Sequence, residues 1–249
     1  MIPKVIHYCW FGPNELPNSA KNYMQTWKKY LPEFEIKLWN ENNFDINIYP
    51  YAKDAYADGK FAFVADICRV HALYYEGGIY LDTDVEVLKN FAPLLEHTAF
   101  SGFEVSTLDI ISDSKEVHTQ MGVIGSKPYA VWIENILSSF KHLQYDKSNA
   151  VTINSIVDSI VIEQGFELKD EFQCIEDYLC LYPSACFIAK DYQTGIINTS
   201  SATFCIHHYD ATWLGFRIRA KTKLKHLLIS TLNEDIFKKL IIIKRKIIK

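Results

Sequence analysis

The sequence predicts an α/β protein, because segments with strand and helix patterns alternate along its first half. The chain has 249 residues, of which 49% are hydrophobic and 22% charged, which is enough apolar material for a single core. A short apolar run over residues 4–10 predicts a buried first strand. No stretch approaches the ~18 apolar residues that a membrane-spanning helix needs. We therefore expect a globular domain.

Local patterns place the expected elements in chain order. Aromatic residues recur at helical spacing over residues 19–30, and an almost wholly apolar helix over residues 61–76 ends at Gly77-Gly78, a residue type that favours helix C-caps. Two further helices are expected from Pro128 to about Leu143 and over residues 151–163. Strands are expected over residues 4–10, 34–39, 79–81, 85–87, 99–103 and 121–125 and near Cys174, Leu181 and 204–208, with a loop over 40–50.

Charge is distributed unevenly along the chain. Residues 1–216 contain 28 acidic and 15 basic side chains, whereas residues 217–249 contain eleven basic side chains and two acidic ones. We therefore expect a domain at 1–216 and a basic, amphipathic helical tail at 217–249. The acidic body argues against nucleic acid as a partner, and the tail suits an anionic membrane surface. The alternative is a tail that packs on the body with a solvated basic face.

The six cysteines predict reduced, mostly buried thiols. None of them forms a Cys-x-x-Cys pair, and in a chain of this length their spacing argues against a disulfide framework. This usage is typical of a cytoplasmic protein, which the basic tail would bring to the inner face of the plasma membrane. The cysteines are Cys9, Cys68, Cys174, Cys180, Cys186 and Cys205.

The most informative motif is Asp82-Thr83-Asp84, which follows a short apolar strand and a glycine pair. Ligands usually bind at the carboxyl ends of strands in α/β proteins. Two carboxylates held together there repel each other unless a cation or a proton lies between them. Their hard oxygen atoms suit Mg²⁺ or Mn²⁺, ions that usually also bind a substrate phosphate. The alternative is a solvated turn with two exposed acids.

Asp66 and Arg69 are the charged residues of the apolar stretch 61–70, and at this spacing they share one face of its helix. Charges in so apolar a helix are costly unless they are paired or bind a ligand. Because only the glycine pair joins this helix to the strand of the Asp-x-Asp motif, we expect these charges and the motif at one cleft. There a carboxylate can hold sugar hydroxyls and a guanidinium can bind an anionic oxygen. The alternative is an intrahelical salt bridge.

Two further segments carry candidate ligands. Trp10 lies at the end of the first strand, where it could stack on a nucleobase, an interaction typically worth ~1–3 kcal/mol, or fill the core. His207 and His208 follow an apolar run. Adjacent residues of a strand face opposite sides, so at most one of these histidines can bind the same metal ion as Asp84. The alternative is a hydrogen-bonded core histidine.

Five segments occur in an order that matches a known family and together cover roughly residues 2–216. The chain resembles the DXD-containing glycosyltransferases of the capsular-polysaccharide and α-mannosyltransferase type, with the glucosyltransferase domain of the large clostridial toxins as a distant relative. The specific feature is Ala-Asp-x-x-Arg combined with Gly-Gly-x-Tyr-Leu-Asp-x-Asp. The segments are Ile2 to Gly12, Leu38 to Phe44, Ala65 to Arg69, Gly77 to Asp84, and His207-His208 with Trp213.

The resemblance implies a GT-A fold, a single α/β domain with a mixed central sheet that binds a nucleotide sugar. It implies that Trp10 stacks on the base. Asn42 would contact the base or the ribose, with Asn40 as the competing candidate. Asp66 and Arg69 would hold the ribose and the donor sugar and count among the catalytic residues.

The resemblance also implies a metal centre. Asp82 and Asp84 would hold Mn²⁺ (or Mg²⁺) and the diphosphate as catalytic residues, and His207 or His208 would complete the metal shell. Tyr80 would touch the donor, and Trp213 would close over the leaving group. The implied reaction moves a hexose from a nucleoside diphosphate sugar to a glycan or lipid-linked glycan acceptor, with retention of the anomeric configuration, in the synthesis of a surface polysaccharide such as a capsule or O-antigen.

Two other classes of protein remain as alternatives. In a haloacid-dehalogenase-like phosphatase, Asp82 would be the nucleophile and Asp84 the acid, but that fold carries its motif on the first strand, and here about eighty residues precede it. The second alternative is a non-catalytic protein that binds sugars or a membrane surface. Such a protein would have lost its catalytic residues, whereas this chain keeps Asp66, Arg69, Asp82 and Asp84.

Overall fold

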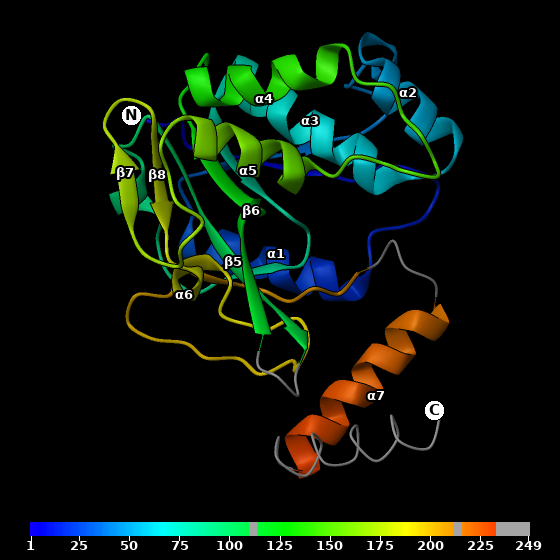
Figure 1. Ribbon diagram of the computed structural model, residues 1–249, viewed down its shortest axis with the longest axis vertical. Helices are drawn as coiled ribbons and strands as arrows, with labels where there is room; N and C mark the ends of the chain where they lie inside the picture. The colour runs from blue at the N-terminus through cyan, green and yellow to red at the C-terminus, as the bar shows by residue number, and fades with distance from the viewer. Residues whose placement is uncertain (110–113, 212–215, 233–249) are drawn as a thin grey trace.

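A computed structural model describes residues 1–109, 114–211 and 216–232. Within these residues, a seven-stranded mixed sheet with the order β2-β1-β3-β6-β5-β8-β7 forms the centre (Figure 1). A second sheet pairs β4 (Val85–Val87) with β9 (Cys205–His207). The strands of the main sheet are β1 Val5–Cys9, β2 Glu35–Trp39, β3 Gly78–Leu81, β5 Ala99–Asp109, β6 Ser114–Ser126, β7 Gln173–Ile175 and β8 Leu179–Tyr182.

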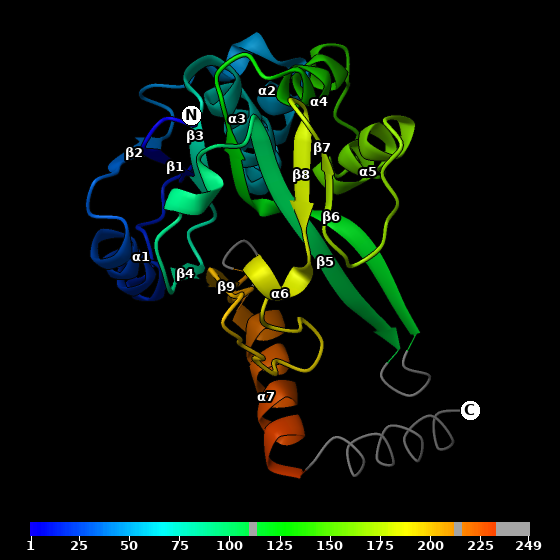
Figure 2. The same ribbon diagram turned by 90° about the vertical axis from the view of Figure 1, so that its left-hand side faces the viewer.

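Helices cover both faces of the main sheet (Figure 2). On one face lie α2 to α5, and on the other lie α1, α6 and the β4–β9 sheet. Helix α7 extends away from these layers in both views. The helices are α1 Asn18–Tyr30, α2 Pro50–Ala57, α3 Phe61–Glu76, α4 Val131–Lys141, α5 Ile153–Glu163, α6 Ser184–Phe187 and α7 Phe216–Leu232, with 3-10 turns η1 Ile46–Ile48 and η2 Ala92–Leu94.

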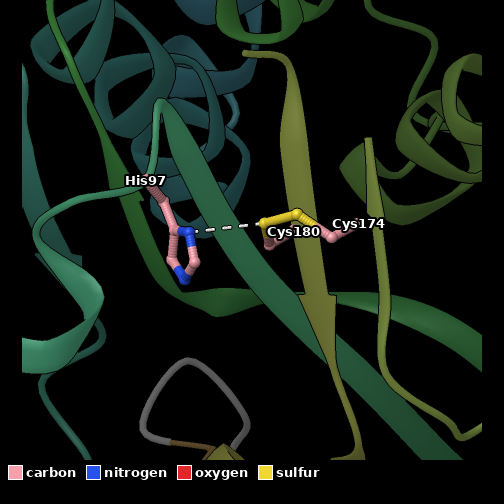
Figure 3. Close-up of side chains that lie close together, drawn as sticks. All are labelled: His97, Cys174 and Cys180. Carbon is pink, nitrogen blue, oxygen red and sulfur yellow. Dashed lines mark hydrogen bonds between the residues drawn. A yellow bond between two sulfur atoms is a disulfide. The ribbon is translucent and has the colours of Figure 1, made fainter. Parts of the chain in front are cut away.

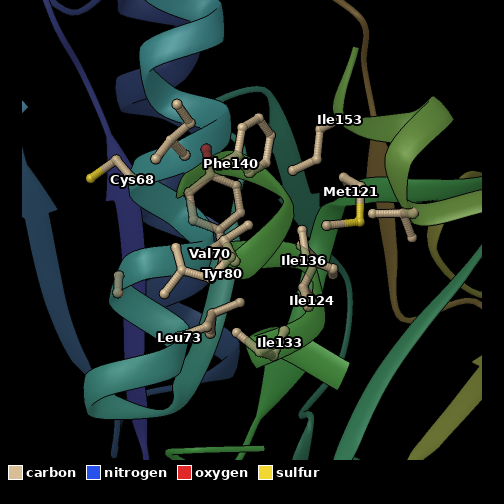
Figure 4. Packing of buried hydrophobic residues seen from close by; sticks show 14 of the residues in the cluster. Cys68, Val70, Leu73, Tyr80, Met121, Ile124, Ile133, Ile136, Phe140 and Ile153 are labelled. Carbon is tan, nitrogen blue, oxygen red and sulfur yellow. The ribbon is translucent and has the colours of Figure 1, made fainter. Parts of the chain in front are cut away.

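Two apolar clusters hold the layers together. Between α3, α4 and the sheet, side chains such as Leu73, Ile136 and Phe140 are almost completely buried (Figure 4). On the opposite face, Trp27 of α1 is buried, and its indole N–H donates to the carbonyl of Val85 at 2.7 Å. Burial of side chains of this size is the main favourable contribution to folding. Both faces of β3 are therefore packed, which fixes the position of the motif at its end.

A glycine turn sets the path from α3 to β3. Gly77 has φ 64° and its N–H donates to the carbonyl of Leu73, which caps the helix. Gly78 has φ 105°, and a Cβ there would lie 2.7 Å from the carbonyl oxygen of Val5 and 2.9 Å from the His7 ring. Both positions need glycine, because a side chain would be strained or would overlap β1. The turn therefore brings β3 directly beside β1, where Ile6 and Ile79 are register partners.

The predicted α/β class and mixed central sheet are confirmed. Helix α2 was not predicted, because the preceding Asn-rich stretch favoured a loop, although Pro50 at its first turn is a helix-start signal. The short α6 was not predicted either. Strands β5 and β6 extend well beyond the predicted 99–103 and 121–125, because they pair with each other as a long antiparallel hairpin. Pro128 precedes α4 rather than lying in its first turn.

The prediction of six reduced cysteines is wrong for one pair. Cys174 and Cys180 form a disulfide, because β7 and β8 place them directly opposite each other in adjacent strands. The other four cysteines are free and buried, as predicted. Sequence spacing of six residues carried no signal for this pairing, which depends on the hairpin register.

The basic tail is described only as far as residue 232. That part is helical, as predicted, but its apolar and basic residues are mixed around the helix rather than separated on two faces, so the amphipathic pattern does not hold for α7. Ile218 and Leu224 are more than half exposed, while Ile229 is buried. No described helix combines the length and apolar content needed to cross a membrane. Residues 233–249 of the predicted tail lie outside the described residues.

Candidate active site

The end of β3 brings two carboxylates and one imidazole together. His207 Nε2 lies 3.0 Å from Asp84 Oδ1 and 3.7 Å from Asp82 Oδ2. One ligand atom from each of the three residues lies within 4.8 Å of the others. The three side chains are 14% to 25% exposed, so the group is accessible but largely surrounded by protein. This geometry can hold one cation between the three residues.

Pairing of β4 with β9 delivers His207 to this group. Val85 is the register partner of His207, and the His208 N–H donates to the Asp84 carbonyl. The chain then turns sharply, with φ 54° at Tyr209, so that the Asp210 N–H donates to Asp84 Oδ2 at 2.9 Å. Positive φ is unfavourable for a bulky residue and is typical of strained backbone at functional sites. The turn therefore holds Asp84 through one oxygen and leaves the other toward His207.

His208 does not join this group. Its Nε2 lies 2.8 Å from Glu86 Oε2, and its ring stacks on Tyr23 with 4.5 Å between centroids. Adjacent residues of a strand point to opposite sides, which sends the two histidines apart. Of the two histidines predicted as metal ligands, the structure therefore brings only His207 to the carboxylates.

A buried ion-pair network supports the carboxylates from the side of α3. Arg69 Nη2 lies 2.8 Å from Asp66 Oδ1, and Arg69 Nη1 lies 3.5 Å from Asp82 Oδ1. Arg69 also donates to the Met121 carbonyl at 2.6 Å and lies over the Tyr80 ring. The Tyr80 hydroxyl in turn donates to Asp82 Oδ1 at 2.8 Å. Arg69 thus joins Asp66 to Asp82, and Asp84 is linked to this network through His207. The intrahelical pair is part of that network.

Burial and charge shift the pKa values of these groups. Burial opposes the charged form of His207, but Asp84, Asp82 and Glu104 outweigh it and raise its pKa to about 9. Burial raises the pKa of Asp66 to about 6 against the opposing effect of Arg69. Without a metal ion, the His207 imidazolium therefore neutralises the carboxylates at neutral pH. Such coupled shifts are characteristic of functional sites.

The donor set fits a hard divalent cation. Carboxylate oxygens and an imidazole nitrogen are ligands that Mn²⁺ accepts, and carboxylates are those Mg²⁺ prefers. Asp82 Oδ2 and Asp84 Oδ1 both face His207, whereas the second oxygens of these carboxylates are held by Tyr80 and by Asp210. These residues therefore fit the metal that the resemblance implies.

The wall of the site formed by β6 was not predicted from the sequence. Gly122 lies so close that a Cβ there would be 2.8 Å from Asp82 Oδ2 and 3.1 Å from His207 Cε1. The buried Gln120 amide braces this point by accepting from the N–H groups of Gly122 and Val123. Glycine inside a strand is a signal of close approach, and it could have indicated this contact.

Tyr209 and Glu104 were also missed. The ring of Tyr209 packs on His207 with 4.3 Å between centroids. Burial raises the pKa of Tyr209, and Glu104, to which its hydroxyl is hydrogen-bonded, raises it further. No local pattern singles out these residues, because β5 and the β9 loop meet only in the folded chain.

The predicted nucleotide-binding residues lie at the ends of β1 and β2. Trp10 is half-buried, and its indole N–H donates to the Asn14 carbonyl at 2.7 Å. The loop after Trp10 meets the loop after β2, because the Gly12 N–H donates to Glu41. Asn42 is exposed there, whereas the Asn40 side chain accepts from the Asn42 N–H and so stabilises the turn. An open cavity of about 480 Å³ is lined by residues 41–47.

The structure thus places the two predicted asparagines differently. Asn42 lines the cavity, and Asn40 is a turn residue. Trp213, predicted to close over the leaving group, lies outside the described residues.

Part of the chain is similar to known glycosyltransferases. Residues 17–101, which include the DXD motif, match the family described as glycosyltransferase sugar-binding region containing DXD motif. Inositol phosphoceramide mannosyltransferase 3 of Schizosaccharomyces pombe is 33% identical over 103 residues, which are 40% of this chain and 29% of the relative. An uncharacterized glycosyltransferase of Acanthamoeba polyphaga mimivirus is 31% identical over 157 residues, 60% of this chain and 59% of the relative.

The chain spans less than two thirds of the length of these relatives. Among solved structures, PaToxG Glycosyltransferase aligns with a TM-score of 0.47 and 18% identity over 66% of this chain and 70% of that one, a likeness too low to establish a shared fold. The family match over residues 17–101 and the relatives confirm the resemblance to DXD-containing glycosyltransferases. Residues 17–101 are thus similar to the sugar-binding region of DXD-containing glycosyltransferases.

Proposed function

We propose that this protein is a metal-dependent, retaining glycosyltransferase that moves a hexose from a nucleoside diphosphate sugar to a glycan or lipid-linked glycan acceptor. The observation that carries the proposal is the convergence of Asp82, Asp84 and His207 at the end of β3, beside the Arg69–Asp66 pair. The family match supports this assignment for residues 17–101. The proposed fold is of the GT-A type, with a catalytic domain at 1–216 and a tail at 217–249.

The donor would extend from the loops after β1 and β2 to the carboxylates at the end of β3. In the proposal, its base stacks on Trp10 and contacts Asn42 at the rim of the cavity after β2. Its sugar lies toward Asp66 and Arg69, with Tyr80 beside them. The carboxylate of Asp66 is ionised near neutral pH and can accept from sugar hydroxyls.

The charges of the site suit departure of a diphosphate. A bound Mn²⁺ or Mg²⁺ would supply positive charge where the leaving group becomes more negative. Asp82, Asp84 and His207 would hold that ion, and the ion pair with Arg69 positions Asp82. Preorganised charge of this kind is commonly the largest contribution to catalysis. We expect the acceptor hydroxyl to attack from the same face as the leaving group, which retains the anomeric configuration.

The relatives suggest which donor to test first. Two of them are named inositol phosphoceramide mannosyltransferases, so mannose is the first sugar and a lipid-borne acceptor the first acceptor class to examine. We infer a role in the synthesis of a surface glycan such as a capsule or O-antigen. The donor sugar, the acceptor class and this biological role are proposals, because the matches to these relatives cover less than two thirds of their length.

The test is donor hydrolysis with a panel of nucleoside diphosphate hexoses, with and without Mn²⁺. We expect release of nucleoside diphosphate from one donor only with metal, and a retained anomer in the product by NMR. Asp84→Asn should abolish the release, whereas the matched control Asp54→Asn, an exposed residue of α2, should not.

The same assay, extended to small phosphate esters, separates the two rival classes of protein. Release of inorganic phosphate from small phosphate esters would favour a phosphatase. Donor binding without release under any condition would favour a non-catalytic sugar-binding protein. Either result would overturn the proposal.

We further propose that the basic tail binds an anionic membrane surface, at the inner face of the plasma membrane of a cytoplasmic enzyme. In α7, Lys221 and Lys223 are exposed next to the exposed Ile218 and Leu224. Each basic residue near an anionic leaflet contributes ~1 kcal/mol at best. The helix is anchored to the loop before β9, because Lys225 donates to Gln193.

Flotation with phosphatidylglycerol and phosphatidylcholine vesicles tests this association. We expect binding to the anionic vesicles only, and loss of binding in the full-length double variant Lys221→Glu/Lys223→Glu. The control Lys28→Glu/Lys29→Glu changes the same charge on α1 and should bind as the wild type does. Equal binding by both variants, or no binding by the wild type, would contradict the association.

A further inference from the structure

A second cluster of potential ligands lies away from the DXD motif. Cys174 is on the edge strand β7, Cys180 on the neighbouring β8, and His97 in the loop before β5 (Figure 3). Strands β6 and β5 separate this edge of the sheet from β3. One ligand atom of each residue lies within 4.8 Å of the others. The cluster is therefore a separate site from the one proposed for the donor.

The backbone fixes the distances in this cluster. Cys174 and Cys180 are register partners with Cα atoms 4.0 Å apart, and they form a disulfide. His97 Nδ1 points to Cys180 Sγ at 3.4 Å (Figure 3). A tetrahedral zinc ion with bonds of about 2.3 Å to sulfur and about 2.0 Å to nitrogen separates these two atoms by about 3.5 Å. The His97–Cys180 pair thus already has the spacing of two zinc ligands.

Tyr182 orients the imidazole. Its hydroxyl lies 2.8 Å from His97 Nε2, which leaves Nδ1 toward the sulfur atoms. Tyr182 is itself held by Phe172 and Phe187, whose rings lie 5.0 and 5.6 Å from its own. Metal-binding histidines almost always use their other ring nitrogen in such an outer hydrogen bond. Two adjacent cysteines form a disulfide without any histidine beside them. The orientation of the His97 ring toward Cys180 therefore indicates that the three residues can bind a metal ion.

We propose that His97, Cys174 and Cys180 form a binding site for Zn²⁺ when the two cysteines are reduced, and that the disulfide is the metal-free, oxidised form of the same site. Thiolate and imidazole ligands select zinc over the hard cations of the DXD site. The described residues supply three ligands, which leaves the fourth position to water. Cys174 is exposed, so a reductant can reach the sulfur pair.

A phosphine reductant converts the oxidised form of the site into the reduced form. The S–S bond takes up two electrons and two protons to give two thiols, while the phosphine and one water become the phosphine oxide. Zn²⁺ then binds both sulfur atoms and releases the two thiol protons. Binding joins the β7–β8 edge to the loop before β5 and stabilises the native state by mass action.

The test uses Co²⁺ as a spectroscopic substitute for zinc in the full-length Asp84→Asn protein, which weakens binding at the DXD motif. After phosphine treatment and desalting without oxygen, we expect one equivalent of Co²⁺ with a near-ultraviolet thiolate-to-cobalt charge-transfer band, which carboxylates cannot produce. Excess Zn²⁺ should remove the band. The oxidised protein should show no band.

Variants identify the ligands. Cys174→Ser should abolish the band, and Tyr182→Phe should weaken metal affinity by about 10–100-fold, the usual cost of losing an outer partner. Cys186→Ala, which removes a free buried cysteine outside the cluster, is the matched control and should retain the band. A reduced protein without a thiolate band, or a full band in Cys174→Ser, would overturn the proposal and leave Cys174–Cys180 a structural disulfide.

Discussion

Replacing Gly122 with alanine is the sharpest test of how the DXD site is built. The new Cβ would lie 2.8 Å from Asp82 Oδ2, about 0.6 Å inside the 3.4 Å at which ordinary contacts begin. The Asp82 carboxylate cannot simply retreat, because its other oxygen accepts from Tyr80 at 2.8 Å and faces Arg69. Gly122 is also fixed, since its carbonyl accepts from the Asp82 N–H and its N–H donates to Gln120.

The expected effect is therefore concentrated on metal binding. Overpacking of this kind costs about 1–3 kcal/mol of stability, which for a chain of this size lowers Tm by roughly 2–4 °C for each kcal/mol. Misplacing a ligand and its support typically costs about 10–100-fold in metal affinity. We expect Gly122→Ala to show both, with Mn²⁺ affinity reduced at least 10-fold.

Mn²⁺ affinity can be measured without knowing the donor, from the electron paramagnetic resonance signal of the free aquo ion, together with Tm. Gly59→Ala is the matched control, since its Cβ would meet no atom within 4 Å but its φ of 67° makes alanine strained. This control should lower Tm and leave Mn²⁺ affinity unchanged. Wild-type Mn²⁺ affinity in folded Gly122→Ala would refute the placement of the metal ion between Asp82 and His207.

Two further predictions concern the same network, and a third concerns His118, which pairs with Asp158 and Glu116. His207→Ala should reduce Mn²⁺ affinity at least 10-fold, whereas His208→Ala should not, and equal losses in the same titration would contradict the assignment of the ligand. Arg69→Met leaves the buried Asp66 without a partner, so it should cost about 3–5 kcal/mol in urea unfolding, and a loss below about 1 kcal/mol would show that the pair is not structural. Burial lowers the pKa of His118, but its hydrogen bonds to Asp158 and Glu116 outweigh burial and raise the pKa above 6.5. The stabilising effect of the protonated His118 is therefore fully present below pH 6.5 and is lost as the pH rises through the raised pKa. The Tm difference between wild type and His118→Gln should therefore shrink from pH 5.5 to pH 9. A constant Tm difference would show that protonation of His118 does not stabilise the fold.

Local sequence signals were sufficient for most elements. The helix from Phe61 to Glu76 and its glycine cap follow from apolar periodicity and from the conformational freedom of glycine, which act within a few residues. The contact of Asp66 and Arg69 with the DXD motif could also be predicted, because a two-residue turn cannot separate neighbouring elements. The resemblance to DXD-containing glycosyltransferases rested on these same segments, and the family match over residues 17–101 confirms that resemblance.

Other features depended on which distant segments meet. The choice of His207 over His208 is decided by the register of β9 against β4, which no pattern within residues 204–208 specifies. Gly122 faces the carboxylates only because β6 pairs with β3, and Cys174 faces Cys180 only because β7 and β8 form a hairpin in that register.

The amino-acid sequence by itself therefore determined the charges that gather at the end of β3, since spacing along one helix and one strand is a local property. The tertiary structure alone decided which imidazole completes that group and which thiols meet at the far edge of the sheet. The physical reason is that strand register is set by the packing of side chains far apart in the chain, and a shift by one residue would turn each of these groups to the opposite face.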